Sequence, residues 1–166
     1  MEFTALPESF PEWFRYAFPE VIWSDRCVRD DSDIPRRVGN TLLKGLRNDI
    51  EVFRCRGLID ETPVYQRFLR QVNDVRADFP ELLSGRFICA DGIEWDDPDI
   101  VVRGFAGPER IALVATTQKA GRRGTVVRIP GYHISQVRTV GQASAFTSGR
   151  INLRQHTFAV LLFEKD

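Results

Sequence analysis

One change of pattern along the chain constrains its fold more than any other feature. The first half alternates short apolar runs with amphipathic helical stretches, whereas the part after Gly85–Gly92 contains short β-like runs separated by glycine. The first pattern is typical of parallel βα units, and the second is typical of an antiparallel sandwich. We therefore expect an α+β protein with a βαβα region at 1–85 and an antiparallel β-sandwich at 86–166.

The first region predicts two strands and two helices in alternation. The run EVIWSD at 20–25 predicts a short strand, and DIEVFRC at 49–55 predicts a second one. Between them, Pro35 suits the first turn of a helix, where no backbone donor is needed. A longer amphipathic helix begins at Pro63 and ends near Pro80, with Arg76 assigned to its polar face.

Two glycines interrupt the first of these helices. Gly39 and Gly45 each lower its intrinsic helix propensity by about 1 kcal/mol relative to alanine. We expect Gly39 to allow a neighbouring element to approach closely.

The second region contains six β-like runs. They are GRFICADG, DIVVRGFAG, ERIALVATTQ, GTVVRIP, YHISQVRTV and RINLRQHTFAVLLFE. Turn residues such as Asp91-Gly92 and Pro130-Gly131 separate them. The segment HTFAVLLFE at 156–164 is the most apolar, so we place it centrally.

The charge balance and the cysteines argue against several classes of function. The 23 basic and 23 acidic residues cancel, whereas a nucleic-acid or membrane-surface partner usually requires a basic excess. Cys27, Cys55 and Cys89 form no CxxC pair and the two histidines are far apart, so we predict no metal site and no cofactor. No run approaches the ~20 apolar residues of a membrane span. No signal peptide is recognisable, so a cytoplasmic location is expected.

Four charged segments have structural explanations that we prefer to functional ones. The acids of DDSD at 30–33 and DE at 60–61 precede helices, so capping is favoured over a pair of acid–base carboxylates. The acidic DGIEWDDPD at 91–99 lacks the full spacing of a calcium loop and predicts a solvated turn. The basic QKAGRRGTVVR at 118–128 lacks Walker spacing and predicts a hairpin tip.

Four segments share the order of elements in a known enzyme class. They are FRYAFPEVIWSD, IPRRVGNTLLKGLRNDIEVFRC, DETPVYQRFLRQVNDVRADFPELLSGRF and the closing LRQHTFAVLLFE. Their order resembles the C-terminal part of a (β/α)8-barrel glycoside hydrolase of the α-amylase or α-galactosidase kind. In such enzymes the segments would be the last two βα units of the barrel and the C-terminal sandwich.

The resemblance implies a truncated, carbohydrate-related protein. A complete barrel needs roughly 250 residues, so about six βα units would be absent from this chain. In these families the catalytic carboxylates usually come from the middle strands, which would place them outside the chain. The resemblance therefore implies a glycoside-hydrolase-like protein that is not catalytic alone, and no catalytic residue is assigned.

Barrel active sites lie at the carboxyl ends of the strands. The resemblance thus implies a substrate-binding role for Trp23, Asp25, Arg54 and Arg56. Trp23 can stack on a sugar ring, Asp25 can accept hydrogen bonds from hydroxyls, and either arginine can hold a polar substrate. The alternative is that Trp23 is packed core and the others are loop or ion-pair residues.

Two further hypotheses remain beside the truncated hydrolase. One is a stand-alone carbohydrate- or protein-binding module with no enzymatic activity, which uses the sandwich as its binding surface. The other is a subunit that completes a barrel supplied by another protein chain. The candidate partners are therefore a carbohydrate and a completing chain, with no nucleic acid and no membrane.

Overall fold

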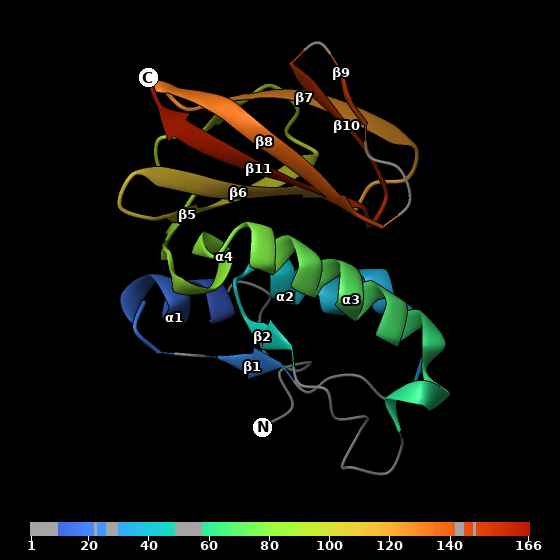
Figure 1. The fold of residues 1–166 in the computed structure, drawn as a ribbon. Coiled ribbons are helices and arrows are strands. Elements are labelled where there is room, and N and C mark those ends of the chain that lie inside the picture. Colours follow the sequence, from blue (N-terminus) through green and yellow to red (C-terminus); the bar gives the residue numbers. More distant parts are fainter. Residues whose placement is uncertain (1–9, 22, 26–29, 49–57, 142–144, 148) are drawn as a thin grey trace.

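Three layers make up the protein in the computed structural model, which describes residues 10–21, 23–25, 30–48, 58–141, 145–147 and 149–166. The helices are α1 (Phe10–Ala17), α2 (Ile34–Leu43), α3 (Pro63–Asp78) and α4 (Glu81–Ser84), with a 3-10 turn, η3, at Ile59–Glu61. The strands are β1 (Ser24–Asp25), β2 (Arg47–Asn48), β3 (Arg86–Cys89), β4 (Glu94–Trp95), β5 (Ile100–Ala106), β6 (Arg110–Thr117), β7 (Arg122–Arg128), β8 (Tyr132–Val140), β9 (Ala145–Thr147), β10 (Arg150–Arg154) and β11 (Phe158–Lys165). A five-stranded sheet lies between the helices and a four-stranded sheet (Figure 1).

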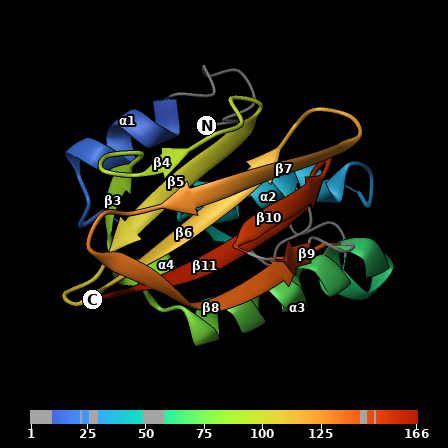
Figure 2. The same cartoon turned by 90° about the horizontal axis from the view of Figure 1, so that it is seen from above.

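Strands β3 to β11 confirm the expected antiparallel, sandwich-like C-terminal region. The five-stranded sheet has the order β3-β5-β6-β11-β8, and the four-stranded sheet has the order β4-β7-β10-β9. Neighbouring strands pair antiparallel in both, and Figure 2 shows one sheet above the other. Strands β4 and β9 have two and three residues, which is too short for the alternation that identifies a strand in sequence.

Strand β11 contributes to both hydrophobic cores. Its alternate residues divide between them: Phe158, Val160 and Leu162 pack toward the helices, and Ala159, Leu161 and Phe163 pack toward the four-stranded sheet. A strand that is buried on both faces needs a continuous apolar run. This explains why 156–164 is the most apolar segment, and the pairing of β11 with both β6 and β8 confirms that it lies inside its sheet.

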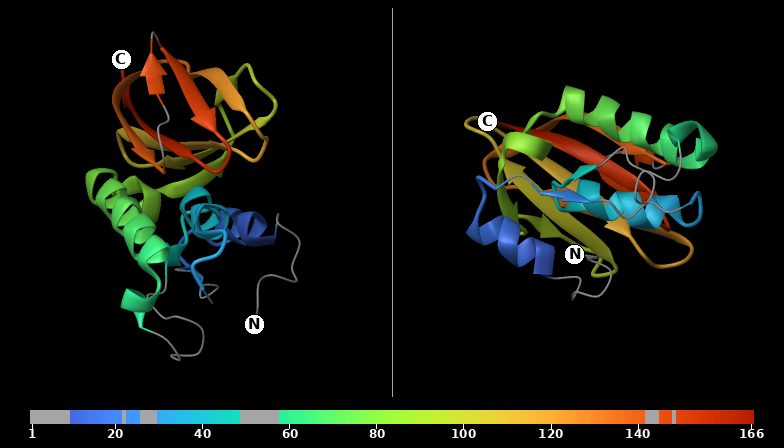
Figure 3. Two further views of the ribbon diagram at one scale, coloured as in Figure 1. Left: turned by 90° about the vertical axis from the view of Figure 1, so that its right-hand side faces the viewer. Right: turned by 90° about the horizontal axis from the view of Figure 1, so that it is seen from below.

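Helices α2 and α3 cover the other face of the five-stranded sheet, as both views in Figure 3 show. Their apolar stripes form the core with that sheet through Ile34, Val38 and Leu42 from α2 and Tyr65, Phe68, Leu69 and Val72 from α3. The stripes predicted from helical spacing are therefore the faces that contact the sheet. Within the described ranges, no helix is both long and apolar enough to cross a membrane.

A short parallel pair of strands lies beyond the helices. Strands β1 and β2 pair with Ser24 opposite Arg47 and Asp25 opposite Asn48, and α2 connects them. The strand predicted at 20–25 is reduced to its last two residues, because the chain before it turns and the Val21 amide donates to the Phe18 carbonyl. The strand predicted at 49–55 lies outside the described residues, and β2 immediately precedes it.

Gly39 lies where α2 crosses β11. A Cβ atom placed on Gly39 would lie 1.9 Å from Cζ of Phe158, far inside van der Waals contact. The expected close approach at this glycine is confirmed, and it is β11 that approaches.

We expect Gly39→Ala to lower the free energy of unfolding by about 1–3 kcal/mol, the usual penalty for overpacking a core. The higher helix propensity of alanine relative to glycine offsets only about 1 kcal/mol of this packing penalty. Denaturant unfolding followed by circular dichroism measures the change. Gly39→Ala combined with Phe158→Leu should lose less than the sum of the two single variants, because the smaller side chain makes room for the methyl group. Strict additivity would contradict the contact.

Candidate functional site

The carboxyl ends of β1 and β2 meet at one edge of the parallel pair. Asp25 and Asn48 are register partners and are the last residues of their strands. The Arg47 amide donates to the Trp23 carbonyl at 2.7 Å, which fixes the register. The backbones of these two residues are therefore neighbours, at an edge equivalent to the carboxyl ends of other parallel strands that carry binding sites. We call this the β1–β2 edge.

The predicted site residues have different surroundings. Asp25 lies at the β1–β2 edge, and Arg54 and Arg56 fall outside the described residues. Trp23, directly before β1, is half-buried, and its ring packs edge-on against Phe14 with the ring centroids 4.2 Å apart. The structure thus brings Asp25 beside Asn48 and packs Trp23 against α1.

Asn48 was not identified from the sequence, although its side chain makes two hydrogen bonds at this edge. Its Nδ2 donates to Thr41 Oγ1 at 2.6 Å, and Arg76 Nη1 donates to its Oδ1 at 2.8 Å. Thr41 in turn donates to the Val38 carbonyl at 2.6 Å. Helices α2 and α3 therefore hold the Asn48 amide from two sides. The sequence contained one indication, since Arg76 interrupts the apolar stripe of α3 four residues after Val72.

Arg76 is buried, which corrects its assignment to the polar face of α3. Its side chain is 7% exposed, and Arg76 Nη2 also donates to the Leu46 carbonyl. Burial, and secondarily the positive charge of Arg47, lower the pKa of Arg76 to about 10. Arg76 therefore stays a cation at neutral pH. Its described partners at this point are the Leu46 carbonyl and the Asn48 amide oxygen, which are both uncharged. Arg76 therefore orients the Asn48 side chain and keeps its own positive charge.

The acidic segment that follows β1 caps a helix, although not the one expected. Asp31 Oδ2 accepts from the Val64 amide and Asp31 Oδ1 from the Tyr65 amide, both at 3.0 Å. These are N–H groups of the first turn of α3, which have no partner within the helix. The side chain of Thr62, the residue directly before α3, does not cap this helix and donates to the Ile59 carbonyl.

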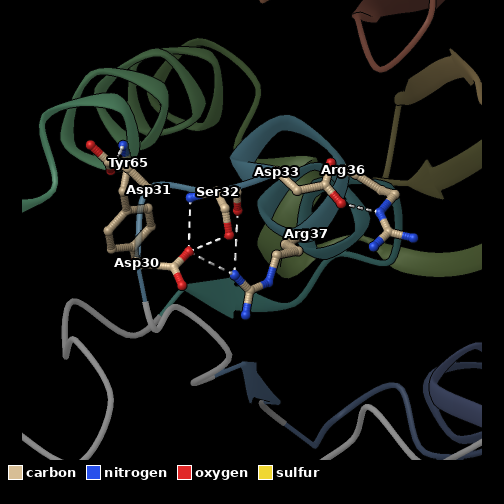
Figure 4. A network of polar contacts seen from close by, with 7 residues as sticks. All are labelled: Asp30, Asp31, Ser32, Asp33, Arg36, Arg37 and Tyr65. Atoms are coloured by element: carbon tan, nitrogen blue, oxygen red, sulfur yellow. Dashed lines mark hydrogen bonds and ion pairs between the residues drawn. The ribbon is translucent and has the colours of Figure 1, made fainter.

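Neighbouring residues of the same segment hold its loop in place (Figure 4). Asp30 Oδ1 accepts from the Ser32 amide at 2.8 Å and from the Ser32 hydroxyl, and it lies 3.6 Å from Arg37 Nη1. Asp33 precedes α2 with φ 55° and pairs with Arg36, so its side chain makes no cap of α2. The carboxylates of this loop are thus engaged in capping and loop closure.

The acidic turn at 91–99 organises the edge of the four-stranded sheet. Asp96 Oδ1 accepts from the Thr125 hydroxyl at 2.6 Å and from the Val126 amide at 3.0 Å. These hydrogen bonds, led by that from Thr125, lower the pKa of Asp96. Among the residues that the structure describes, no three His, Cys, Asp or Glu side chains gather as a metal site would require.

Asp31→Ala should lower the free energy of unfolding by about 0.5–2 kcal/mol, the usual loss for a helix cap. Asp31→Asn should lose less, because its amide oxygen can still accept. The control is Asp74→Ala, which removes an exposed carboxylate from the middle of α3 and should change stability by no more than about 0.5 kcal/mol. Denaturant unfolding measures all three. Equal losses for Asp31→Ala and Asp74→Ala would contradict the capping role.

The lowered pKa of Asp96 predicts a pH dependence of stability. A carboxyl whose pKa is lower in the folded state stabilises that state above its ordinary pKa of about 3.9. This stabilisation is lost as the pH falls through the lowered folded value. The difference in melting temperature between the wild type and Asp96→Asn should therefore be constant from about pH 7 to about pH 5 and shrink below about pH 4. A difference that grows toward acid pH would contradict this.

No protein-family model matches the sequence, and no curated protein matches it significantly. Similar solved structures include Eubacterium rectale Amy13B, with 12% identity and a TM-score of 0.44 over 62% of this chain and 20% of that one. An isomaltulose synthase mutant from Erwinia rhapontici NX5 in complex with D-glucose has 15% identity and a TM-score of 0.46 over 63% and 18%. Bacillus licheniformis trehalose-6-phosphate hydrolase has 16% identity and a TM-score of 0.43 over 61% and 18%. The chain thus matches about a fifth of the length of these glycoside hydrolases of the α-amylase family.

Proposed function

We propose that this chain is a glycoside-hydrolase-like protein that binds carbohydrate at the β1–β2 edge and does not hydrolyse glycosidic bonds by itself. The observation that carries the proposal is the parallel register that places Asp25 beside Asn48. Trp23, Arg54 and Arg56 are further candidate contacts.

The chemistry of Asn48 suits a sugar hydroxyl. A side-chain amide has two N–H donors and two acceptor lone pairs. Thr41 takes one donor and Arg76 one lone pair, which leaves one of each beyond the hydrogen bonds to described residues. Because both helices hold the amide, little side-chain entropy remains to be lost on binding. Asp25, the register partner of Asn48, contributes a residue type that accepts stronger, charge-assisted hydrogen bonds.

The lack of hydrolytic activity follows from what the nearby carboxylates already do. A glycosidase uses two carboxyl groups about 5 to 10 Å apart, one as acid and one as base or nucleophile. Asp31 accepts two amides of α3 and Asp30 accepts two groups of Ser32. Recruiting either for proton transfer would uncap α3 or open the loop. We therefore propose that the catalytic carboxylates lie outside this chain.

One observation favours the second candidate, a stand-alone binding module. Helices α2, α3 and α4 and the five-stranded sheet share one continuous core, as expected of a self-contained unit. Another observation favours the completing subunit, since β1 and β2 form a sheet of two strands among the described residues, and such a pair is marginal unless further strands or helices cover it. Melting of the isolated chain distinguishes them, because a module unfolds cooperatively alone and a completing subunit requires its partner.

Isothermal titration calorimetry with neutral α- and β-linked gluco-oligosaccharides tests the site. We expect Asp25→Ala and Asn48→Ala each to weaken binding by roughly tenfold, as for the loss of a strong hydrogen bond. The distant Asp74→Ala should leave affinity unchanged, and the same sugars incubated with the wild type should release no reducing ends. Absence of binding by the wild type, or equal affinity for all variants, would reject the site.

A further inference from the structure

Four arginines gather on the outer face of the four-stranded sheet, which is nearest the viewer in Figure 2. Arg122 and Arg128 come from β7, Arg150 and Arg154 come from β10, and all four are exposed. Arg154 is the register partner of Arg122, and opposed residues of antiparallel strands point to the same face. Since side chains alternate along a strand, Arg128 and Arg150 share that face too, opposite the buried Val127. We call it the arginine face.

The arginine face is positively charged although the chain as a whole is neutral. Among the described residues of this face, the acids are Glu94, opposite Arg128, and Asp96, which lies 3.3 Å from Arg150. Four positive charges therefore meet two negative ones, in a chain whose net charge is zero.

One pair of these arginines is unfavourable for folding. Arg122 and Arg154 are directly opposed, and like charges in that position destabilise a sheet. The register of the described strands places no acid opposite either residue. An anion bound between them would turn the repulsion into attraction.

A third arginine is already held in place. Arg150 Nη2 donates to the Gly124 carbonyl at 2.8 Å, and Asp96 fixes Nη1. A Cβ atom on Gly124 would lie 3.0 Å from Arg150 Nε and 3.0 Å from Asn152 Oδ1. Because position 124 is glycine, the Arg150 side chain can lie flat across β7. Its guanidinium is thus oriented before any ligand arrives, which lowers the entropic cost of binding.

We propose that the arginine face binds an acidic glycan, a polysaccharide that carries carboxylates. A guanidinium pairs with a carboxylate through two parallel hydrogen bonds, which lysine cannot reproduce. Arg122 and Arg128 are six residues apart on one strand, which corresponds to about 20 Å. A row of that length suits an extended polyanion better than a single small anion.

Two considerations favour a glycan over a nucleic acid. Proteins that bind single-stranded nucleic acids combine positive charge with aromatic side chains on which bases stack. The positions between these arginines are Gly124, Val126 and Asn152, none of which is aromatic. The choice of a glycan also rests on the proposed carbohydrate function, whereas the location of the arginine face does not.

Calorimetric titration with polygalacturonate tests the proposal. A salt concentration of about 50 mM suits the experiment, because exposed charges are screened little at low ionic strength. We expect Arg122→Gln/Arg154→Gln to weaken binding by about tenfold or more. Its melting temperature should stay equal or rise, because the opposed charges are gone. The matched control is Arg67→Gln/Arg70→Gln on α3, which removes the same charge from two exposed arginines of another layer and should bind like the wild type.

Three outcomes would overturn the proposal. Equal weakening by both double variants would show diffuse attraction by net charge. Absence of binding by the wild type would exclude the ligand class, and tighter binding of single-stranded DNA that is lost in Arg122→Gln/Arg154→Gln would assign the face to nucleic acid. Polygalacturonate binding in a wild type that binds no neutral sugar would reject the β1–β2 edge alone and leave the arginine face standing.

Discussion

The burial of β11 on both faces is the constraint on which the rest of the structure depends. One strand supplies apolar side chains to the helical layer and to the second sheet, so neither layer can shift without disturbing the other. Phe158 shows this coupling most directly, because it lies under Gly39 of α2 and meets Phe68 of α3 edge-on at 6.3 Å. The two helices that orient Asn48 are therefore positioned by a strand of the sandwich. Because the core is close-packed, a shift of β11 would displace α2 and α3 and with them the Asn48 side chain at the β1–β2 edge.

The polar groups around that edge combine stability with the proposed recognition chemistry. Arg76 gives up hydration to reach Asn48 and the Leu46 carbonyl, which is unfavourable unless its hydrogen bonds are well formed. The result is an amide with a fixed orientation at the end of a strand. Asp31 acts similarly over a long distance in sequence, joining the loop after β1 to the start of α3. The loop after β1 and the start of α3 are thus fixed by polar contacts, whereas the helices and sheets pack on one another through apolar ones.

Features set by burial were predictable from the sequence, and features set by pairing were not. The stripe of α3 and the continuous apolar run of β11 follow from helical period and two-sided burial, so they are recognisable in the residues alone. That acids at 30–33 would cap a helix was also expected, but which helix Asp31 caps depends on the path of the loop. Asn48 and Arg76 are 28 positions apart, and nothing local links them. The same holds for Arg122 and Arg154, which become neighbours only through strand register.

The position of β11 along the chain has a consequence for the order of folding. The strand that completes both cores is the last one described, and its pairing with β6 spans all of β7 to β10. Such long-range contacts slow folding, because the chain loses the entropy of closing a large loop before the stabilising contacts form. During synthesis the helices and the first strands emerge while the central position between β6 and β8 is still empty. Until β11 enters, those two strands each expose an unpaired edge and an apolar surface, the kind of intermediate that chaperones recognise.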